Sequence, residues 1–113
     1  PSVVTYCATK FYVSAFTEGL AQELAARGAK LRAKLLAPAA TQTEFGAVAN
    51  NNPSYDYDKA FGTYHTSAQM AEFLLALYDS DQTLGIVDRE TLTFRLCAPQ
   101  LPYAANSARN QKV

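Results

Sequence analysis

The 113-residue sequence predicts an α/β fold with the element order helix, strand, loop, helix, strand. Two segments carry apolar residues at three- and four-residue steps, the spacing of helices that bury one face. A short segment with a strand pattern follows each of them: the first alternates and ends in an apolar run, and the second alternates strictly and is rich in strand-forming residues. A helix between two strands is typical of the crossover in a parallel sheet, so we expect the two strands to pair in parallel.

The first helix is predicted from about residue 5 to Arg27, and we expect it to run without a break from Tyr6. Gly28 follows as a natural helix stop. The periodic apolar positions of this segment are Ala8, Phe11, Tyr12, Ala15, Phe16, Leu20 and Leu24.

The first strand is predicted over residues 30–37, which end in an apolar run before Pro38. Residues 38–66 then show no sustained period, and we expect a long surface excursion with one or two short helices. Excursions of this length are usually functional or disordered, and a lid over a site is the functional option. Its aromatic residues either line an apolar substrate pocket or pin the excursion to its own domain, namely Phe45, Tyr55, Tyr57, Phe61 and Tyr64.

The second helix is predicted over residues 67–79, with Thr66 or Ser67 as its N-terminal cap. Residues 91–96 alternate strictly between apolar and polar residues and predict the second strand, which Pro99 and Pro102 end. The polar tail, residues 104–113, is expected to fray. Two strands are too few for a covered parallel sheet, so we expect the sheet to continue into residues outside this sequence or into another copy of the chain.

Composition and charge narrow the possible functions. Ten basic and ten acidic residues give no net charge, and therefore no broad positive field to attract nucleic acid or anionic lipid. Cys7 and Cys97 have neither a metal-ligand nor a redox spacing, and the longest apolar runs are too short to cross a bilayer. We expect a soluble, cytoplasmic protein without a metal. His65 has no clustered ligand partner and is predicted to be an exposed loop residue.

Tyr6 and Lys10 are the strongest candidates for chemistry. Four residues apart on a helix, they share one face and can reach a common ligand. An ammonium group near a phenol favours the charged phenolate, which helps the phenol to exchange a proton with a carbonyl or alcohol oxygen. Tyr55 and Lys59 have the same spacing, but neighbouring aspartates would neutralise the lysine, and we interpret that pair as part of a solvated loop.

The context of Tyr6 resembles one family. Its Tyr-x-x-x-Lys helix continues into the stretch Leu-Ala-Gln-Glu-Leu and is followed, after a strand, by Pro-Ala-Ala-Thr-Gln-Thr at residues 38–43. Together these segments resemble the C-terminal half of the short-chain dehydrogenases/reductases. The likeness continues through Glu44-Phe45, the helix around Met70 and the segment 84–88.

The resemblance implies a fold, an activity and a cofactor. Residues 1–103 would be the C-terminal part of a Rossmann-like, doubly wound parallel sheet. The parent protein would be an oxidoreductase that uses NAD or NADP and moves a hydride to or from a small-molecule carbonyl or secondary alcohol substrate. Tyr6 would exchange the proton and Lys10 would bind the ribose hydroxyls. The segment bordering the nicotinamide would comprise Pro38, Ala40, Thr41 and Thr43.

This sequence departs from the family pattern in two ways. Ala39 stands where the family usually has glycine, and its Cβ would hinder a positive φ or a close cofactor approach. The glycine-rich turn that seats the pyrophosphate and the catalytic serine would both lie before Pro1. We therefore expect a piece of a longer protein, inactive alone and associating into homo-oligomers through the helix that begins at Tyr6. The alternative is a non-catalytic remnant of the family that acts as a packing or interaction module.

Overall fold

The computed structural model describes residues 2–102 of the chain. Its elements are α1 (Ser2–Ala26), β1 (Leu35–Ala37), β2 (Thr41–Gln42), α2 (Phe45–Ala49), α3 (Tyr57–Ala60), β3 (His65–Thr66), α4 (Ser67–Asp79), β4 (Leu84–Val87) and β5 (Phe94–Cys97). This is an α/β arrangement, broadly compatible with part of a Rossmann-like sheet. The polar tail predicted at residues 104–113 lies outside the described residues.

The main sheet has three strands in the order β1-β4-β5. β1 pairs in parallel with β4, with Leu35 opposite Leu84, and β5 pairs antiparallel with β4, with Phe94 opposite Val87. The prediction that residues 30–37 and 91–96 pair in parallel is therefore wrong. β4 lies between the two strands, and β5 returns from it through a short turn that reverses the chain direction. The sheet is mixed rather than purely parallel.

The turn between β4 and β5 is built on Asp88. Its carboxylate accepts hydrogen bonds from the backbone N–H groups of Glu90 (2.9 Å) and Thr91 (2.8 Å), and the Asp88 N–H donates to the Thr93 carbonyl (2.9 Å). Such side-chain bonds to the backbone two residues ahead mimic a backbone turn. They fix a tight hairpin, which explains why β5 cannot continue in the direction of β4.

The prediction of one unbroken first helix is confirmed by α1. It ends where Gly28 adopts a φ of +65°, with its N–H bonded to the Ala25 carbonyl at 3.0 Å and the Ala29 N–H bonded to the Leu24 carbonyl at 3.0 Å. A left-handed residue that redirects the last carbonyl bonds is a common helix terminator, and glycine adopts that conformation without strain.

The second predicted helix is confirmed as α4, with the predicted bounds. The Thr66 side chain accepts a hydrogen bond from the Gln69 N–H, and the Gln69 side chain in turn accepts one from the Thr66 N–H. This reciprocal capping pair satisfies N–H groups that have no partner inside the helix. The hydrophobic core lies where α4 packs on the sheet, and its buried side chains are Leu77, Leu84 and Val87.

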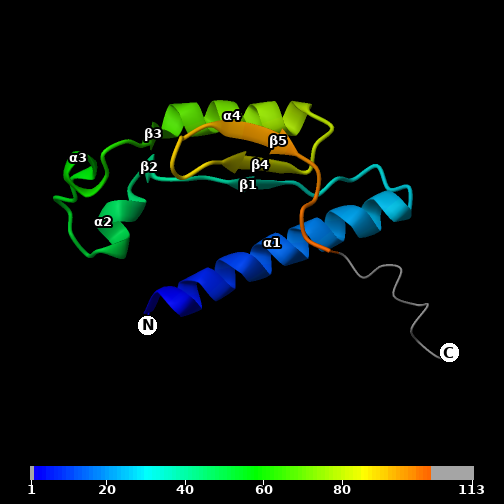
Figure 1. The fold of residues 1–113 in the computed structure, drawn as a ribbon, viewed down its shortest axis with the longest axis horizontal. Helices are drawn as coiled ribbons and strands as arrows, with labels where there is room; N and C mark the ends of the chain where they lie inside the picture. The colour runs from blue at the N-terminus through cyan, green and yellow to red at the C-terminus, as the bar shows by residue number, and fades with distance from the viewer. Residues whose placement is uncertain (1, 103–113) are drawn as a thin grey trace.

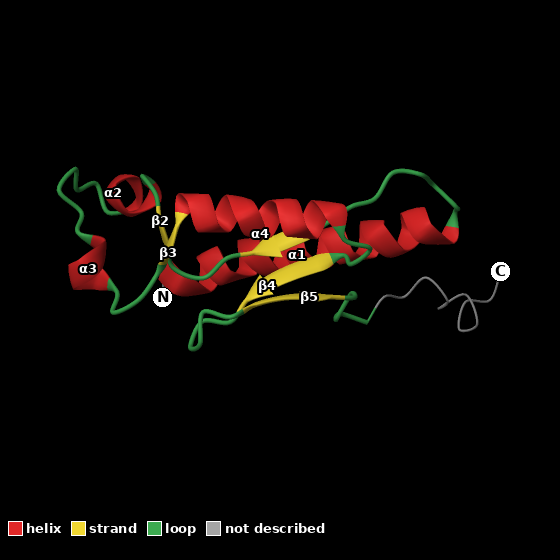
Figure 2. Ribbon diagram, turned by 90° about the horizontal axis from the view of Figure 1, so that it is seen from above, coloured by secondary structure: helices red, strands yellow, loops and turns green. Residues whose placement is uncertain are grey.

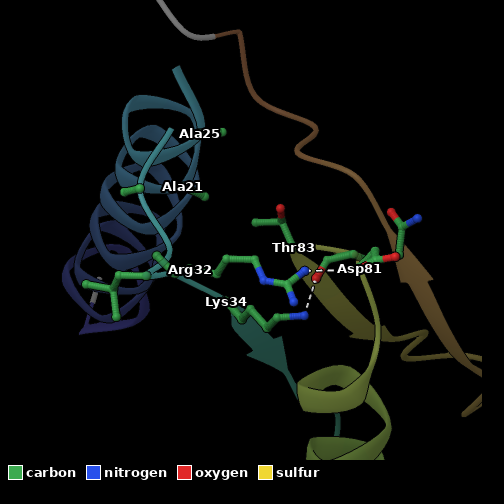
Figure 3. Close-up of a pocket in the computed structure, with 10 residues that line it drawn as sticks. Ala21, Ala25, Arg32, Lys34, Asp81 and Thr83 are labelled. Atoms are coloured by element: carbon green, nitrogen blue, oxygen red, sulfur yellow. Dashed lines mark hydrogen bonds and ion pairs between the residues drawn. The ribbon is translucent and has the colours of Figure 1, made fainter. Parts of the chain in front are cut away.

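Lys34 holds the other end of α4. Its ammonium donates hydrogen bonds to the carbonyl groups of Leu77 (2.8 Å), Ser80 (2.5 Å) and Gln82 (2.9 Å). Burial, reinforced by the nearby Arg32 charge, lowers the pKa of Lys34. Figure 3 shows Arg32 pointing at Asp81, its partner in a 3.0 Å ion pair, with Lys34 beside it. These side chains border a small hollow of about 200 Å³ next to α1. The cation neutralises the negative end of the helix dipole.

The two long helices lie on either side of the sheet. Figure 1 shows α4 above it and α1 below it, where α1 contacts β1. The N-terminal end of α1 and the small helices α2 and α3 gather at one end of the molecule in both views (Figures 1 and 2). The carboxyl end of β1 points into the same region. None of the described helices combines the length and apolar character that a membrane span requires.

Candidate functional site

A cavity of about 530 Å³ lies at the carboxyl end of β1. Its walls come from the first turns of α1, from the segment after β1 and from the excursion that carries α2 and α3. The lining residues are Tyr6, Lys10, Pro38, Ala39, Ala40, Thr41, Thr43, Phe45, Gly46, Asn50, Tyr55, Tyr57, Phe61 and Met70. All of the site residues named from the sequence therefore surround one cavity.

Tyr6 and Lys10 contribute the N-terminal end of α1 to this cavity. The Lys10 Nζ atom lies 5.5 Å from the centroid of the Tyr6 ring. At this distance the ammonium stabilises electron density on the ring. Tyr6 is 49% exposed and lines the cavity, so a molecule in the cavity can contact it. The pair can exchange a proton with a bound oxygen atom.

Hydrogen bonds to β3 and within the segment hold the residues after β1 in place. β2 pairs in parallel with β3, the His65 N–H donates to the Ala40 carbonyl at 3.0 Å, and the Thr41 hydroxyl donates to the Ala39 carbonyl at 3.0 Å. The Thr43 hydroxyl accepts a hydrogen bond from the Phe45 N–H at 3.2 Å. These bonds present hydroxyl and backbone polar groups at the cavity edge. They are the kind of groups that bind a carboxamide.

Ala39 does not have the strained backbone that its position suggested. Within the described residues a positive φ occurs at Gly28, Asn51 and Leu92, and Ala39 is not among them. Its Cβ therefore costs no backbone strain. The other expectation for Ala39, that its methyl group hinders the close approach of a cofactor, stays a prediction.

The excursion folds around Tyr57. The ring of Tyr57 packs edge-on against Tyr55 (centroids 5.1 Å apart), stacks on Phe61 (5.8 Å) and tilts against Tyr64 (5.5 Å). Its hydroxyl accepts a hydrogen bond from the Gly46 N–H at 3.1 Å. Burial acts to raise the pKa of Tyr57, but hydrogen bonding with Thr43 and with the Gly46 N–H outweighs burial and lowers it.

Of the two roles that the sequence left open for the loop aromatics, the structure shows the lining of a cavity. Four of them line the cavity, namely Phe45, Tyr55, Tyr57 and Phe61. Tyr64 is not part of the lining, and its contact with Tyr57 and its 2.7 Å hydrogen bond to Asp58 stay within the excursion. Lys59 lies in α3 and pairs with Asp56 at 3.7 Å on the surface, as expected for a solvated lysine. Tyr55 lines the cavity, so the interpretation of Tyr55 and Lys59 as part of a solvated loop is wrong for Tyr55.

The prediction of an exposed loop histidine at position 65 is wrong. His65 is 9% exposed, and its ring meets Phe73 edge-on with centroids 5.1 Å apart. The residue belongs to β3, which leads directly into α4, and two-residue strands leave too short a pattern to be detected in a sequence. Its Nδ1 atom has no hydrogen-bond partner among residues 2–102. Within that range no three His, Cys, Asp or Glu side chains gather as a metal site.

Comparison with known proteins relates the chain to an oxidoreductase over part of its length. No protein-family model matches the sequence. An uncharacterized oxidoreductase of Staphylococcus saprophyticus is 37% identical over 62 residues, which are 54% of this chain and 25% of that protein. The match thus spans about a quarter of the length of the relative.

Proposed function

We propose that the intact protein is an NAD(P)-dependent short-chain dehydrogenase/reductase that moves a hydride between the nicotinamide and a carbonyl compound or secondary alcohol. The observation that carries the proposal is the convergence of Tyr6, Lys10, Thr41 and Thr43 on one cavity. This cavity lies at the carboxyl end of a parallel strand, where open α/β sheets bind ligands. The oxidoreductase relative supports the same class of reaction.

The polar groups of the cavity fit a nicotinamide nucleoside. The Lys10 ammonium can donate hydrogen bonds to vicinal ribose hydroxyls, and the Thr41 and Thr43 hydroxyls can bind the carboxamide. Pro38 and Ala40 supply apolar surface beside the ring. A bound nicotinamide supplies or accepts the hydride, which no side chain of the chain can do.

Tyr6 is the proposed acid/base group. In the direction of reduction its hydroxyl donates a proton to the carbonyl oxygen as negative charge develops there, and in oxidation the phenolate accepts the proton of the alcohol. The Lys10 Nζ atom lies 5.5 Å from the centroid of the Tyr6 ring, so both side chains can contact the same bound molecule. Lys10 is therefore proposed to hold the cofactor beside Tyr6.

Residues 1–113 by themselves are proposed to bind either cofactor weakly and to transfer no hydride. A pyrophosphate is normally held by the N–H groups of a helix N-terminus behind a glycine-rich turn. The five glycines of this chain are spread over its length and form no such turn.

The activity test follows NADH and NADPH absorbance in the intact protein with a set of ketones and aldehydes, and NAD and NADP reduction with the matching alcohols. We expect turnover with one of the two cofactors and at least one carbonyl class. Lack of turnover in both directions, with cofactor binding also absent by calorimetry, would contradict the proposal.

The exposed surface of α1 bears on the second candidate, an interaction module. α1 exposes a series of large apolar side chains, namely Val3, Val4, Phe11, Tyr12, Val13 and Phe16. Exposed large apolar side chains in such a series are typical of surface that is covered by other protein. We propose that it is the contact of a homo-oligomer, which is compatible with either function.

A further inference from the structure

We infer that Tyr57 determines substrate specificity, by holding the aromatic wall of the cavity in the shape that accepts an uncharged substrate with an aryl or bulky alkyl body. The aromatic wall consists of Phe45, Tyr55, Tyr57 and Phe61. This inference rests on the proposed function, because the substrate is taken to be the compound whose oxygen meets Tyr6.

Tyr57 is the residue that joins the parts of the wall. Its ring contacts Tyr55 on one side and Phe61 on the other, and its hydroxyl reaches across to the Gly46 N–H in α2. The single side chain thus connects α3 to α2. Because Phe45 directly precedes Gly46 in α2, the same hydrogen bond also sets the position of Phe45.

The wall leaves little freedom at the point where Tyr57 meets α2. A Cβ added to Gly46 would lie 2.5 Å from the Tyr55 ring and 2.9 Å from the Tyr57 hydroxyl. Gly46 is buried, so its N–H depends on the Tyr57 hydroxyl for a hydrogen bond. Removal of that hydroxyl would leave a buried donor unsatisfied, and α2 would shift to recover a partner.

The charge of the cavity indicates the class of substrate. Among the described residues that line it, Lys10 alone is charged, and the proposed function assigns Lys10 to the ribose. A substrate carboxylate or phosphate would have no free cation there, and a substrate ammonium would have no carboxylate. The aromatic wall and Met70 favour apolar surface, and a charged group placed against them would lose water without gaining a partner of opposite charge.

The experiment compares two alcohols in the intact protein with cofactor present. They are 1-phenylethanol and 4-(1-hydroxyethyl)benzoate, which differ by one carboxylate. Binding is measured by calorimetry, and kcat and KM are measured for the same pair. We expect 1-phenylethanol to bind about tenfold or more tightly than the benzoate, because the charged group lacks a partner. Equal binding would overturn the inference about substrate class.

Tyr57→Phe keeps the ring and removes the bond to Gly46. We expect it to raise KM for 1-phenylethanol roughly threefold to tenfold with kcat nearly unchanged, since the wall contacts the body of the substrate and not the reacting oxygen. The matched control is Tyr64→Phe, which removes an exposed hydroxyl bonded to Asp58 outside the cavity and should change KM less than about twofold. Equal effects of the two variants would overturn the role of Tyr57.

The calorimetric measurement separates this inference from the proposed function. Selective binding of 1-phenylethanol that Tyr57→Phe weakens, without turnover, would support the aromatic wall and contradict the hydride-transfer proposal. Turnover without preference for the uncharged alcohol would support the hydride-transfer proposal and contradict the role of the aromatic wall.

Discussion

The carboxylate of Glu18 lies 2.7 Å from the backbone nitrogen of Leu101 and accepts its hydrogen bond. The same oxygen atom accepts a second bond, also of 2.7 Å, from the Gln100 N–H. Glu18 is only 4% exposed, so a buried charge in the middle of α1 depends on these two donors. The contact ties α1, which carries Tyr6 and Lys10, to the segment that follows β5 (Figure 1).

Glu18→Ala should lower the free energy of unfolding by about 2 to 3 kcal/mol, because two N–H groups lose a charged acceptor. Glu23→Ala is the matched control on the same helix. Glu23 forms an exposed pair with Arg27, and its loss should change stability by less than about 1 kcal/mol. Urea unfolding measures both, and similar losses in the two variants would show that the Glu18 contact has no special importance.

Gly28→Ala should destabilise the protein by about 1 to 2 kcal/mol, since its φ of +65° is strained for a residue with a Cβ. Gly62→Ala provides the comparison. Gly62 has no positive φ and no atom within 4 Å of an added Cβ, so its substitution should change stability by less than about 1 kcal/mol. Thermal unfolding of the two variants decides between these expectations.

The Asp88 turn should make stability depend on acid pH. Hydrogen bonds from the Thr91 and Glu90 N–H groups and from the Thr91 hydroxyl lower the pKa of Asp88. A carboxyl with a lower pKa in the folded state stabilises the protein above its unfolded pKa, and this contribution disappears as pH falls through the folded value. The stability difference between wild type and Asp88→Asn should therefore be full at neutral pH and shrink below about pH 4. A difference that stays constant from pH 7 to pH 2.5 would contradict this account.

The sequence predicted the helices well because their signals are local. The periodic apolar positions end at Gly28, and α4 begins at the predicted Thr66 cap. β4 was not predicted as a strand, because four residues that include Gly85 carry little periodicity. Gly85 is nevertheless required there, since a Cβ would lie 2.9 Å from the Phe94 ring. The antiparallel return of β5 depends on a side-chain turn at Asp88, which the spacing of strands does not encode.

The sequence predicted residues that line the candidate site, but it did not predict the shape of the cavity that they line. Tyr6 and Lys10 share a helical face by their spacing, and the segment after Pro38 follows a strand end. The contribution of Gly46, Asn50 and Met70 to the lining was missed, because it depends on how the excursion folds back around Tyr57. Tertiary contacts among aromatic side chains leave no periodic signal in the sequence.

Substitution of the exposed α1 aromatics should disrupt association. Phe11 and Phe16 are 69% and 59% exposed, and the double change to Glu would place charge on the proposed contact. We expect sedimentation velocity to give an oligomer for the intact wild-type protein and a smaller species for the double variant. Tyr78→Glu, at a 74% exposed aromatic on α4, should leave the oligomer intact. A wild-type monomer at high micromolar concentration would remove this contact from the account.

The role of Lys10 differs from that of Tyr6 and can be separated by substitution. Lys10→Met removes the proposed ribose contact together with the positive charge beside the Tyr6 ring. It should therefore weaken cofactor binding and also lower turnover. Calorimetry with the cofactor and steady-state kinetics measure the two effects, and normal cofactor affinity in Lys10→Met would contradict the ribose contact.

The most direct test of the proposed chemistry compares the kcat of Tyr6→Phe and Tyr12→Phe in the intact protein, together with cofactor affinity. Both changes remove one phenol hydroxyl from α1, but Tyr12 stacks on Phe16 outside the cavity. We predict that Tyr6→Phe lowers kcat by about 10² to 10⁴, the usual contribution of a general acid/base, with cofactor binding nearly unchanged. Tyr12→Phe should retain the kcat of the wild type. A Tyr6→Phe enzyme with wild-type kcat would contradict the role of Tyr6 and with it the central claim.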